Sequence, residues 1–418
     1  MGEVKEYIHL FETENEYTTA RNDNYLEPWV SYTEENTKVN YNMTEEERKQ
    51  KLYGTPLTFE ILTDGNIVWK TSNTASTKTI EYSKDNGVTW TSITSATGGT
   101  PIQVVKGDTV QFRGDNITYG TSSYNSRFDH STSQFNVKGN IMSLIDSTNF
   151  SGLTTLESAY TFSYLFYGCT GLTDASKLIL PATTLAAVCY YNMFQGCTSL
   201  TTTPELPATT LAQRCYDGMF YGCTSLTTAP ELPATTLAEK CYNDMFRGCT
   251  SLTTAPSILP ATTLATNCYA SMFRSCTSLT SAPELPATTL AENCYNTMFF
   301  GCTSLTTAPE LPVTTLVRYC YYFMFWGCTS LTTAPALPAT TLAESCYSSM
   351  FEGCTNLNYI KCLATDISAT DCTSNWVSGV ASSGTFVKNP SMASWTTGTS
   401  GIPTGWTTQN DNNTPVLG

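Results

Sequence analysis

Hydrophobic and polar positions follow one regular pattern over much of the chain. A block reading Leu-Pro-Ala-Thr-Thr-Leu-Ala-x-x-Cys-Tyr-x-x-Met-Phe-x-Gly-Cys-Thr-Ser-Leu-Thr-Thr-Ala-Pro-Glu recurs from about Leu180 to Cys354. Its second cysteine returns every 26 residues, with one step of 27. Together with a diverged copy at Tyr164–Cys169 this makes eight turns. Such a period is typical of a solenoid, in which each turn buries its apolar residues against its neighbours.

Two elements are expected in each turn. Apolar types recur in one block at Cys320, Tyr321, Met324, Phe325 and Cys328. This spacing predicts the inner face of a short helix, which Gly327 would end in a conformation with positive φ. The Ser-Leu-Thr-Thr-Ala segment that follows predicts a short strand, because threonine suits a half-exposed stacked ladder and proline ends it.

Before the repeats, the pattern changes to short β-type runs separated by turn signals such as Asp85-Asn86-Gly87. The runs are Leu57–Leu62, Ile67–Trp69, Thr79–Tyr82, Val88–Trp90, Ile102–Val105 and Thr109–Phe112. They predict a small antiparallel, immunoglobulin-like β-sandwich over residues 56–150, which we interpret as a spacer. The overall expectation is a mixed α/β fold, mainly β, in which this sandwich precedes a solenoid over residues 151–358.

The two ends of the chain differ from both regions. Residues 1–55 carry twelve carboxylates and six basic residues without a clear period. Two interpretations are open for this segment: an arm that orders against a partner, or a partly disordered leader. As an arm, its expected contact residues are Tyr25, Trp29 and Tyr32.

Residues 359–418 are rich in serine, threonine and glycine, with three tryptophans as anchors: Trp376, Trp395 and Trp406. Solenoids need an end piece that covers the last open turn. We therefore interpret this segment as a C-terminal cap.

Charge and composition narrow the function. The net charge is −14 and no basic run occurs, which argues against nucleic acid or an anionic membrane as partner. No window approaches 18 apolar residues, and Met1–Leu10 lacks the apolar core of a signal peptide, so no membrane insertion is expected. A complete chain of this kind would be made and kept inside a cell until released. The cysteine count of 17 is odd and follows the repeat, which favours small buried hydrophobic residues over disulfides.

Catalytic and metal-binding interpretations find little support. The chain has two histidines, His9 and His130, and neither has a cysteine at metal-ligand spacing or a nucleophile motif nearby. The Cys-x₇-Cys spacing within a turn fits packing better than a zinc knuckle. We expect no catalytic residue, no metal and no cofactor.

The positions that vary from turn to turn are expected to face outward. One turn is nearly all aromatic there, and aromatic residues and arginine are favoured at binding hot spots. The candidate binding surface is Tyr221, Arg247, Arg274, Phe300, Arg318, Tyr319, Tyr322, Phe323 and Trp326. In most turns, neutral drift of outward positions explains the variation as well. The aromatic patch also fits a subunit contact or a carbohydrate platform.

The segment Met-Phe-x-Gly-Cys-Thr-Ser-Leu-Thr-Thr resembles the Ala-Phe-x-Gly-Cys-x-x-Leu-x-x-Ile core of BspA-like leucine-rich repeats, which are common in surface proteins of gut Bacteroidetes. The resemblance covers residues 160–360, about half the chain. Methionine stands at the usual alanine position, and Cys-Tyr replaces Ile-Gly, so the turns should be bulkier inside. The segment Tyr25–Tyr32 resembles leaders of structural proteins from Bacteroidales phages. The family implies adhesion and recognition rather than catalysis.

Three functions follow as hypotheses. The first is a virion surface protein of a gut bacteriophage, whose arm binds virion structural proteins and whose solenoid binds a host cell-surface protein or glycan. The second is a bacterial cell-surface or extracellular adhesin of the same family. The third is a purely structural capsid decoration protein. A homo-oligomer is a further partner that the sequence leaves open.

Overall fold

The computed structural model describes residues 45–129, 131–392 and 395–412. The chain divides into two compact units, Met1–Gly54 and Thr55–Gly418. The described part of the first unit is helix α5 (Glu45–Tyr53) followed by Gly54 in a turn. The predicted arm contacts lie outside the described residues, so their role stays a prediction: Tyr25, Trp29 and Tyr32.

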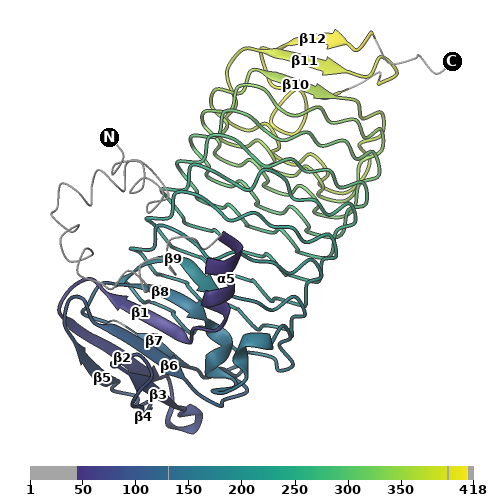
Figure 1. The fold of residues 1–418 in the computed structure, drawn as a ribbon. Coiled ribbons are helices and arrows are strands. Elements are labelled where there is room, and N and C mark those ends of the chain that lie inside the picture. Colours follow the sequence, from purple (N-terminus) through teal and green to yellow (C-terminus); the bar gives the residue numbers. More distant parts are fainter. Residues whose placement is uncertain (1–44, 130, 393–394, 413–418) are drawn as a thin grey trace, which may run out of the picture. The chain divides into compact units, whose positions relative to one another are not determined.

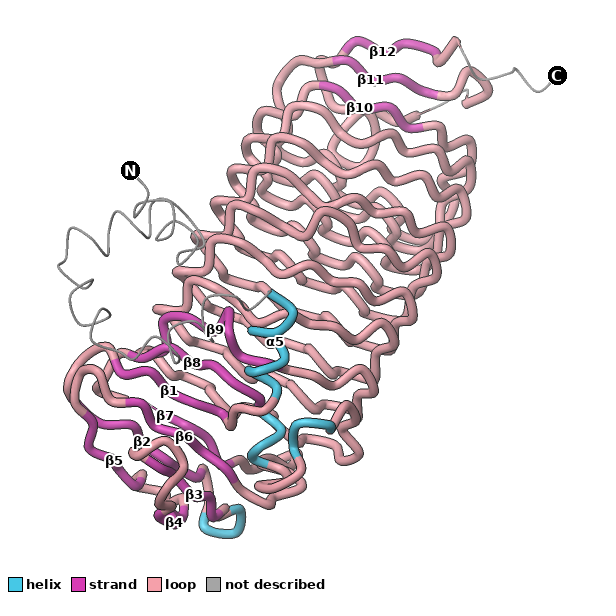
Figure 2. Tube along the Cα trace, viewed as in Figure 1, coloured by secondary structure: helices cyan, strands magenta, loops and turns pink. Residues whose placement is uncertain are grey.

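The described residues are mainly β, with very little helix (Figures 1 and 2). The strands are β1 (Leu57–Ile61), β2 (Gly65–Thr71), β3 (Thr79–Ser83), β4 (Thr91–Thr94), β5 (Thr100–Val104), β6 (Thr109–Arg113), β7 (Ser126–Asp129), β8 (Phe135–Asn140), β9 (Leu172–Ile179), β10 (Tyr359–Cys362), β11 (Thr385–Lys388) and β12 (Thr407–Asn410). Three short 3₁₀ helices are η1 (Thr74–Ser76), η2 (Ile141–Leu144) and η3 (Phe150–Gly152).

Two sheets form the first part of the unit Thr55–Gly418. One has the strand order β4-β3-β6-β1-β8-β9 and the other the order β5-β2-β7. Their pairs are antiparallel, apart from the parallel pair β8 and β9. The Phe59 ring lies 4.6 Å from the Phe135 ring and 4.7 Å from the Phe128 ring, and all three side chains are fully buried. An aromatic cluster therefore forms the centre of this region.

Five of the six predicted runs coincide with strands, and the run Val88–Trp90 does not. It lies in a turn, where the Asp85 carboxylate accepts hydrogen bonds from the Thr89 amide at 2.9 Å and from the Ser83 hydroxyl at 2.7 Å. Val88 is 81% exposed as a result, and β4 begins only at Thr91. Strands β7 and β8 were not predicted, because β7 has a single apolar residue and β8 has two, which makes each alternating run very short.

Strand β9 joins the two-sheet region to the repeats. It belongs to the first repeat and pairs in parallel with β8, with Phe135 opposite Leu172. The Phe166 ring stacks on Phe128 of the sheets at 5.6 Å and on Phe194 of the next repeat at 5.2 Å. The two regions therefore share one continuous hydrophobic core.

Successive repeats stack in register (Figure 1). The Tyr321 amide donates to the Cys346 carbonyl of the next turn at 3.1 Å, and the Phe325 amide donates to the Met350 carbonyl at 2.9 Å. Inside the stack, the repeated phenylalanine rings lie 5.2 to 5.7 Å apart in a column of eight: Phe166, Phe194, Phe220, Phe246, Phe273, Phe299, Phe325 and Phe351. A parallel column of tyrosines runs from Tyr190 to Tyr347.

The helix predicted in each turn is wrong. Backbone φ is +58° at Tyr319, +54° at Phe323 and +69° at Gly327, so every fourth residue is left-handed. Along this segment, backbone amides alternate between two kinds of hydrogen bond. The Tyr321 amide donates to a carbonyl of the next turn, and the Tyr322 amide donates within its own turn, to the Tyr319 carbonyl at 3.3 Å. The result is a ribbon of linked turns with a four-residue period, and the repeats contain no helix where the structure describes them (Figure 2). The expected positive φ at Gly327 is confirmed.

The predicted threonine strands appear mostly as isolated parallel bridges, such as Thr228 with Thr254 and Thr333 with Tyr359. The Thr253 amide and hydroxyl both donate to the Thr227 carbonyl, at 2.9 and 3.1 Å. Proline lacks the amide that a longer ladder needs, so the proline after each threonine pair keeps these strands short.

The turn pattern continues beyond the eight turns expected. Asp371, Asn375 and Gly379 have φ of +52°, +53° and +72°, although we expected these residues to belong to the end piece. Trp376 belongs to this turn, and its ring stacks at 5.8 Å on the ring of Trp395, which follows the turn in the sequence. The short parallel sheet β10-β11-β12 lies at the same end (Figure 1).

All 17 cysteines are buried and unpaired, as expected for small hydrophobic residues. They also take part in the stacking. The Cys302 thiol donates to the Phe273 carbonyl of the preceding turn at 3.1 Å, and Cys223 and Cys328 make the same contact at 3.1 Å.

Candidate recognition face

The left-handed residues bring variable side chains to one outer side of the stack, which we call the turn face. In the turn Tyr319–Gly327, Tyr321, Met324 and Phe325 are buried, whereas Tyr322 and Trp326 are only half-buried. Along each turn, two consecutive residues with outward side chains thus alternate with two whose side chains are buried.

Hydrogen bonds between turns align one position of this face into a column. The Gly248 amide donates to the Arg274 carbonyl of the next turn at 2.8 Å. In the same way, the Ser275 amide donates to the Phe300 carbonyl and the Gly301 amide to the Trp326 carbonyl, both at 2.7 Å. The residues stacked in this way form the aromatic–arginine column: Tyr221, Arg247, Arg274, Phe300 and Trp326.

Side chains within the column contact one another. The Arg247 guanidinium carbon lies 5.2 Å from the centre of the Tyr221 ring, and that of Arg274 lies 4.4 Å from the Phe300 ring. The Phe300 and Trp326 rings stack at 4.3 Å with 11° between their planes. Such contacts contribute roughly 0.5–1.5 kcal/mol each and hold the rings in place before any partner arrives.

A second group of side chains lies beside the end of the column. The Arg318 guanidinium lies 4.5 Å from the Tyr319 ring, and Tyr322 contacts Tyr319 at 5.2 Å and Phe323 at 4.4 Å. Phe323 lies 6.4 Å from Phe300 and links the two groups. The structure therefore places all nine predicted surface residues on the turn face, and their role in binding stays a prediction.

The predicted exposure of this surface needs correction. Of the residues in the most aromatic turn, Arg318 is exposed, whereas Tyr319, Tyr322, Phe323 and Trp326 are half-buried. They cover one another through the ring contacts given above.

Carboxylates balance most of the arginines on this face. Arg247 lies 3.2 Å from an Asp244 oxygen, and Arg318 lies 3.1 Å from Glu344 and 3.7 Å from Glu292. Arg274 has no ion pair among the described residues. Burial and the charge of Arg247 lower the pKa of Arg274, although an arginine stays protonated.

Comparison with protein families matches residues 159–296 and 266–371 to the BspA-type leucine-rich repeat region, in six copies. These residues make up about half of the chain. The chain belongs to the BspA-type leucine-rich repeat family. Repeats of this family are protein-interaction repeats of surface and adhesion-type proteins. No curated protein matches the chain.

The first BspA-type turns carry another aromatic group that the sequence analysis missed. The Tyr164 ring lies 5.6 Å from Tyr167 and 5.2 Å from Tyr191, and the Arg214 guanidinium lies 4.8 Å from Tyr191. Arg214 is paired with the buried Asp217 carboxylate at 2.7 Å, and burial raises the pKa of that carboxyl. The aromatic residues of this group stand at the same repeat positions as those of the turn face. They were missed because the first copy of the repeat has diverged from the others.

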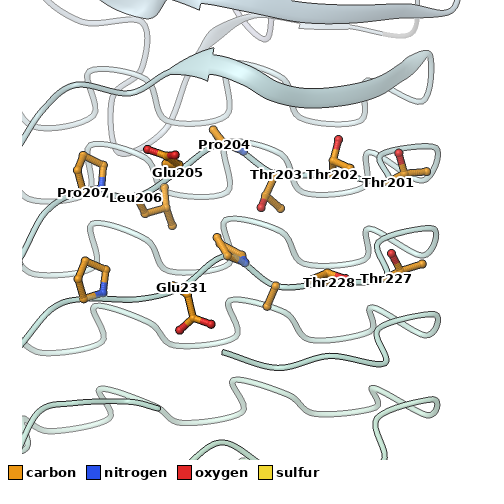
Figure 3. A pocket seen from close by; sticks show the side chains of 13 residues that line it. Thr201, Thr202, Thr203, Pro204, Glu205, Leu206, Pro207, Thr227, Thr228 and Glu231 are labelled. Carbon is orange, nitrogen blue, oxygen red and sulfur yellow. The ribbon is translucent and has the colours of Figure 1, made fainter. Parts of the chain in front are cut away.

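A shallow cavity of about 580 Å³ lies on another side of the BspA-type stack (Figure 3). Two successive turns line it, one with Thr201–Pro207 and the next with Thr227–Glu231 and Pro233. The Glu231 carboxylate at its edge accepts hydrogen bonds from the Ser257 hydroxyl at 3.0 Å and amide at 3.2 Å. The lining is mostly threonine and proline, with two glutamates, Glu205 and Glu231, and none of the predicted site residues contributes to it.

The described part of the chain holds no group of three or more histidine, cysteine or acidic side chains arranged for a metal ion. Across the same residues, none of the helices has the length and hydrophobicity needed to cross a membrane.

Proposed function

We propose that this chain is a non-enzymatic recognition protein displayed on the surface of a bacteriophage virion. In this proposal the repeats form a solenoid that presents its turn face to a host cell-surface protein or glycan. The two-sheet region is an immunoglobulin-like spacer, and residues 1–55 attach the protein to the particle.

The observation that carries the proposal is the composition of the turn face. Phe300, Trp326, Tyr322 and Phe323 lie within contact distance of one another at the surface, with arginines at both sides. Solubility disfavours such a group, whereas interfaces favour tryptophan, tyrosine and arginine at their centres. Threonine rows in the same turns, such as Thr306–Thr307 and Thr332–Thr333, are exposed and uncharged and show no comparable group.

The alternative function is that of an adhesin on a bacterial cell surface. Such an adhesin would bind its partner through the same turn face, but the protein would be attached to a bacterial cell and not to a virion. Binding of the purified full-length protein and of a version lacking residues 1–55 to phage capsids and to intact Bacteroidales cells separates the two. Capsid binding that disappears with residues 1–55 supports the virion protein. Cell binding by both forms without capsid binding supports the bacterial adhesin and overturns the virion assignment.

The capsid decoration protein is tested on the turn face itself. Replacing Tyr322, Phe323 and Trp326 by serine removes host binding if the face recognises the host. If the variant keeps host binding and loses assembly onto capsids, the role is structural.

A further inference from the structure

Arg274 differs from the other arginines of the turn face. Arg214, Arg247 and Arg318 lie 2.7, 3.2 and 3.1 Å from carboxylate oxygens. Within the described ranges, the Arg274 side chain makes no ion pair and no hydrogen bond, and its contact is the Phe300 ring at 4.4 Å. A guanidinium carries five N–H donors in a planar fork that suits a carboxylate. These donors remain available at the middle of the aromatic–arginine column.

The surroundings of Arg274 favour an anion. Arg247 is the neighbour of Arg274 in the column. The partial burial of Arg274 and the positive charge of Arg247 both disfavour the charged form of Arg274. Asp244, whose negative charge acts on Arg274, is already bound by Arg247 at 3.2 Å. A carboxylate arriving at Arg274 relieves the repulsion between the two arginines and satisfies the desolvated donors.

The Phe300 ring beside Arg274 presents its edge. Arg274, Phe300 and Trp326 come from three successive turns, so Arg274 covers one face of the Phe300 ring and Trp326 covers the other. The exposed part of Phe300 is its edge, which carries partial positive charge. A sugar ring that stacks on an aromatic face finds no free face at Phe300, whereas a carboxylate and a side chain packed edge-on both fit.

We propose that the turn face binds an acidic polypeptide segment of a partner protein, whose carboxylate is received by Arg274 and whose adjacent aromatic or aliphatic side chain packs against the edges of Phe300 and Trp326. This inference rests on the proposed function, since it names the partner chemistry of the same face. Charge complementarity at Arg274 and the covered faces of the Phe300 ring favour a polypeptide over an acidic glycan.

A random peptide library selected on the immobilised full-length protein tests this inference. The enriched peptides are expected to place aspartate or glutamate beside an aromatic or aliphatic residue. An enriched peptide should bind Arg274→Gln about tenfold more weakly, because a hydrogen bond to a charged group is lost. Arg274→Lys should fall between the two, since lysine keeps the charge and loses the planar fork.

Lys177→Gln on strand β9 is the matched control, because it removes the same charge from an exposed site outside the turn face and should leave peptide binding unchanged. Melting temperatures of all variants report whether they fold. Enriched peptides that lack acidic residues yet need Trp326 overturn this inference and leave the proposed function standing. Acidic glycans that bind through Arg274, with no peptide enriched, overturn the polypeptide partner. Absence of binding to peptides, glycans and cells contradicts both.

Discussion

At the scale of single residues, the stack depends on backbone conformations that most side chains avoid. Left-handed conformation costs an L-residue roughly 1–2 kcal/mol, and each turn holds three such residues. Glycine occupies the third of these positions in most turns, but Ser275 has φ of +61° there. The hydrogen bonds to the next turn, such as Ser275 amide to Phe300 carbonyl at 2.7 Å, hold the strained residues in place.

Exchanging serine and glycine at these positions tests this strain. Ser275→Gly should raise the free energy of unfolding by about 0.5–1 kcal/mol, because relief of strain exceeds the flexibility that glycine adds to the unfolded chain. Gly301→Ser should lower it by a similar amount, since an added Cβ meets nothing closer than 3.7 Å and strain alone remains. Urea denaturation measures both changes. A destabilised Ser275→Gly variant contradicts the explanation.

Buried thiols should make the stack sensitive to alkali. Burial raises the pKa of Cys249 and of Cys302 to about 12, whereas a thiol in an unfolded chain titrates near pH ~8.5. Above that pH the unfolded chain releases protons that the folded chain keeps, so the free energy of unfolding falls. The loss is about 1.4 kcal/mol per pH unit for each thiol, up to the folded pKa.

Urea midpoints measured at neutral pH and at increasing alkaline pH check this expectation. The midpoint should fall steadily with rising pH, and Cys302→Ser should show a smaller fall. A midpoint that does not change with alkaline pH refutes the role of the buried thiols.

At the scale of elements, the sequence predicted which residues are buried but assigned them to the wrong element. Inward positions such as Cys320, Met324 and Cys328 were identified correctly. Their four-residue period differs from the 3.6 of a helix by less than one residue over this short span, so the pattern could not separate the two. Positive φ at Tyr319 and Phe323 is unusual for aromatic residues, and no propensity signals it.

Far-UV circular dichroism tests the turn ribbon directly. The protein should show little of the double minimum of α-helix, because the turns lack consecutive hydrogen bonds from residue i to residue i−4. Strong helical signal, persisting in a protein that begins at Thr55, supports helices in the repeats and contradicts the ribbon.

The turn face was predictable in part. In a strict repeat, the positions that vary from turn to turn can be identified from the sequence, so the nine surface residues could be named. The structure places them together on the turn face. The ion pair of Arg318 could not be predicted from the sequence, because Glu344 belongs to the next turn and meets Arg318 only when the turns are stacked. The group around Tyr164 and Tyr191 was missed because the first repeat departs from the consensus.

At the scale of the unit Thr55–Gly418, both ends of the stack are closed. The parallel pair β8 and β9 and the contact of Phe128 with Phe166 cover the first turn. Trp376, Trp395 and Phe386 cover the last turns, with rings 5.4 to 6.1 Å apart. A repeat stack without such ends exposes its apolar columns, so we expect the two-sheet region to be part of the folding unit.

Truncation separates the contribution of each part. A protein that begins at Thr55 should keep the melting temperature of the full chain, because the unit Thr55–Gly418 is compact by itself. A protein that begins at Asp146 loses β1 to β8 and should aggregate or melt at lower temperature, since Phe162 and Phe166 lose their cover. Equal melting of all three proteins contradicts the role of the sheets as an end cap.

The most direct test of recognition through the turn face is equilibrium binding to intact Bacteroidales cells, with three proteins compared at matched folding. They are the unaltered chain, the variant Phe300→Ser with Trp326→Ser, and a control with Thr307→Ser and Thr333→Ser on exposed threonines of the same turns. The account predicts that the first variant loses most of its binding while the control binds as the unaltered chain does. Full binding by the first variant, with its melting transition intact, contradicts the account.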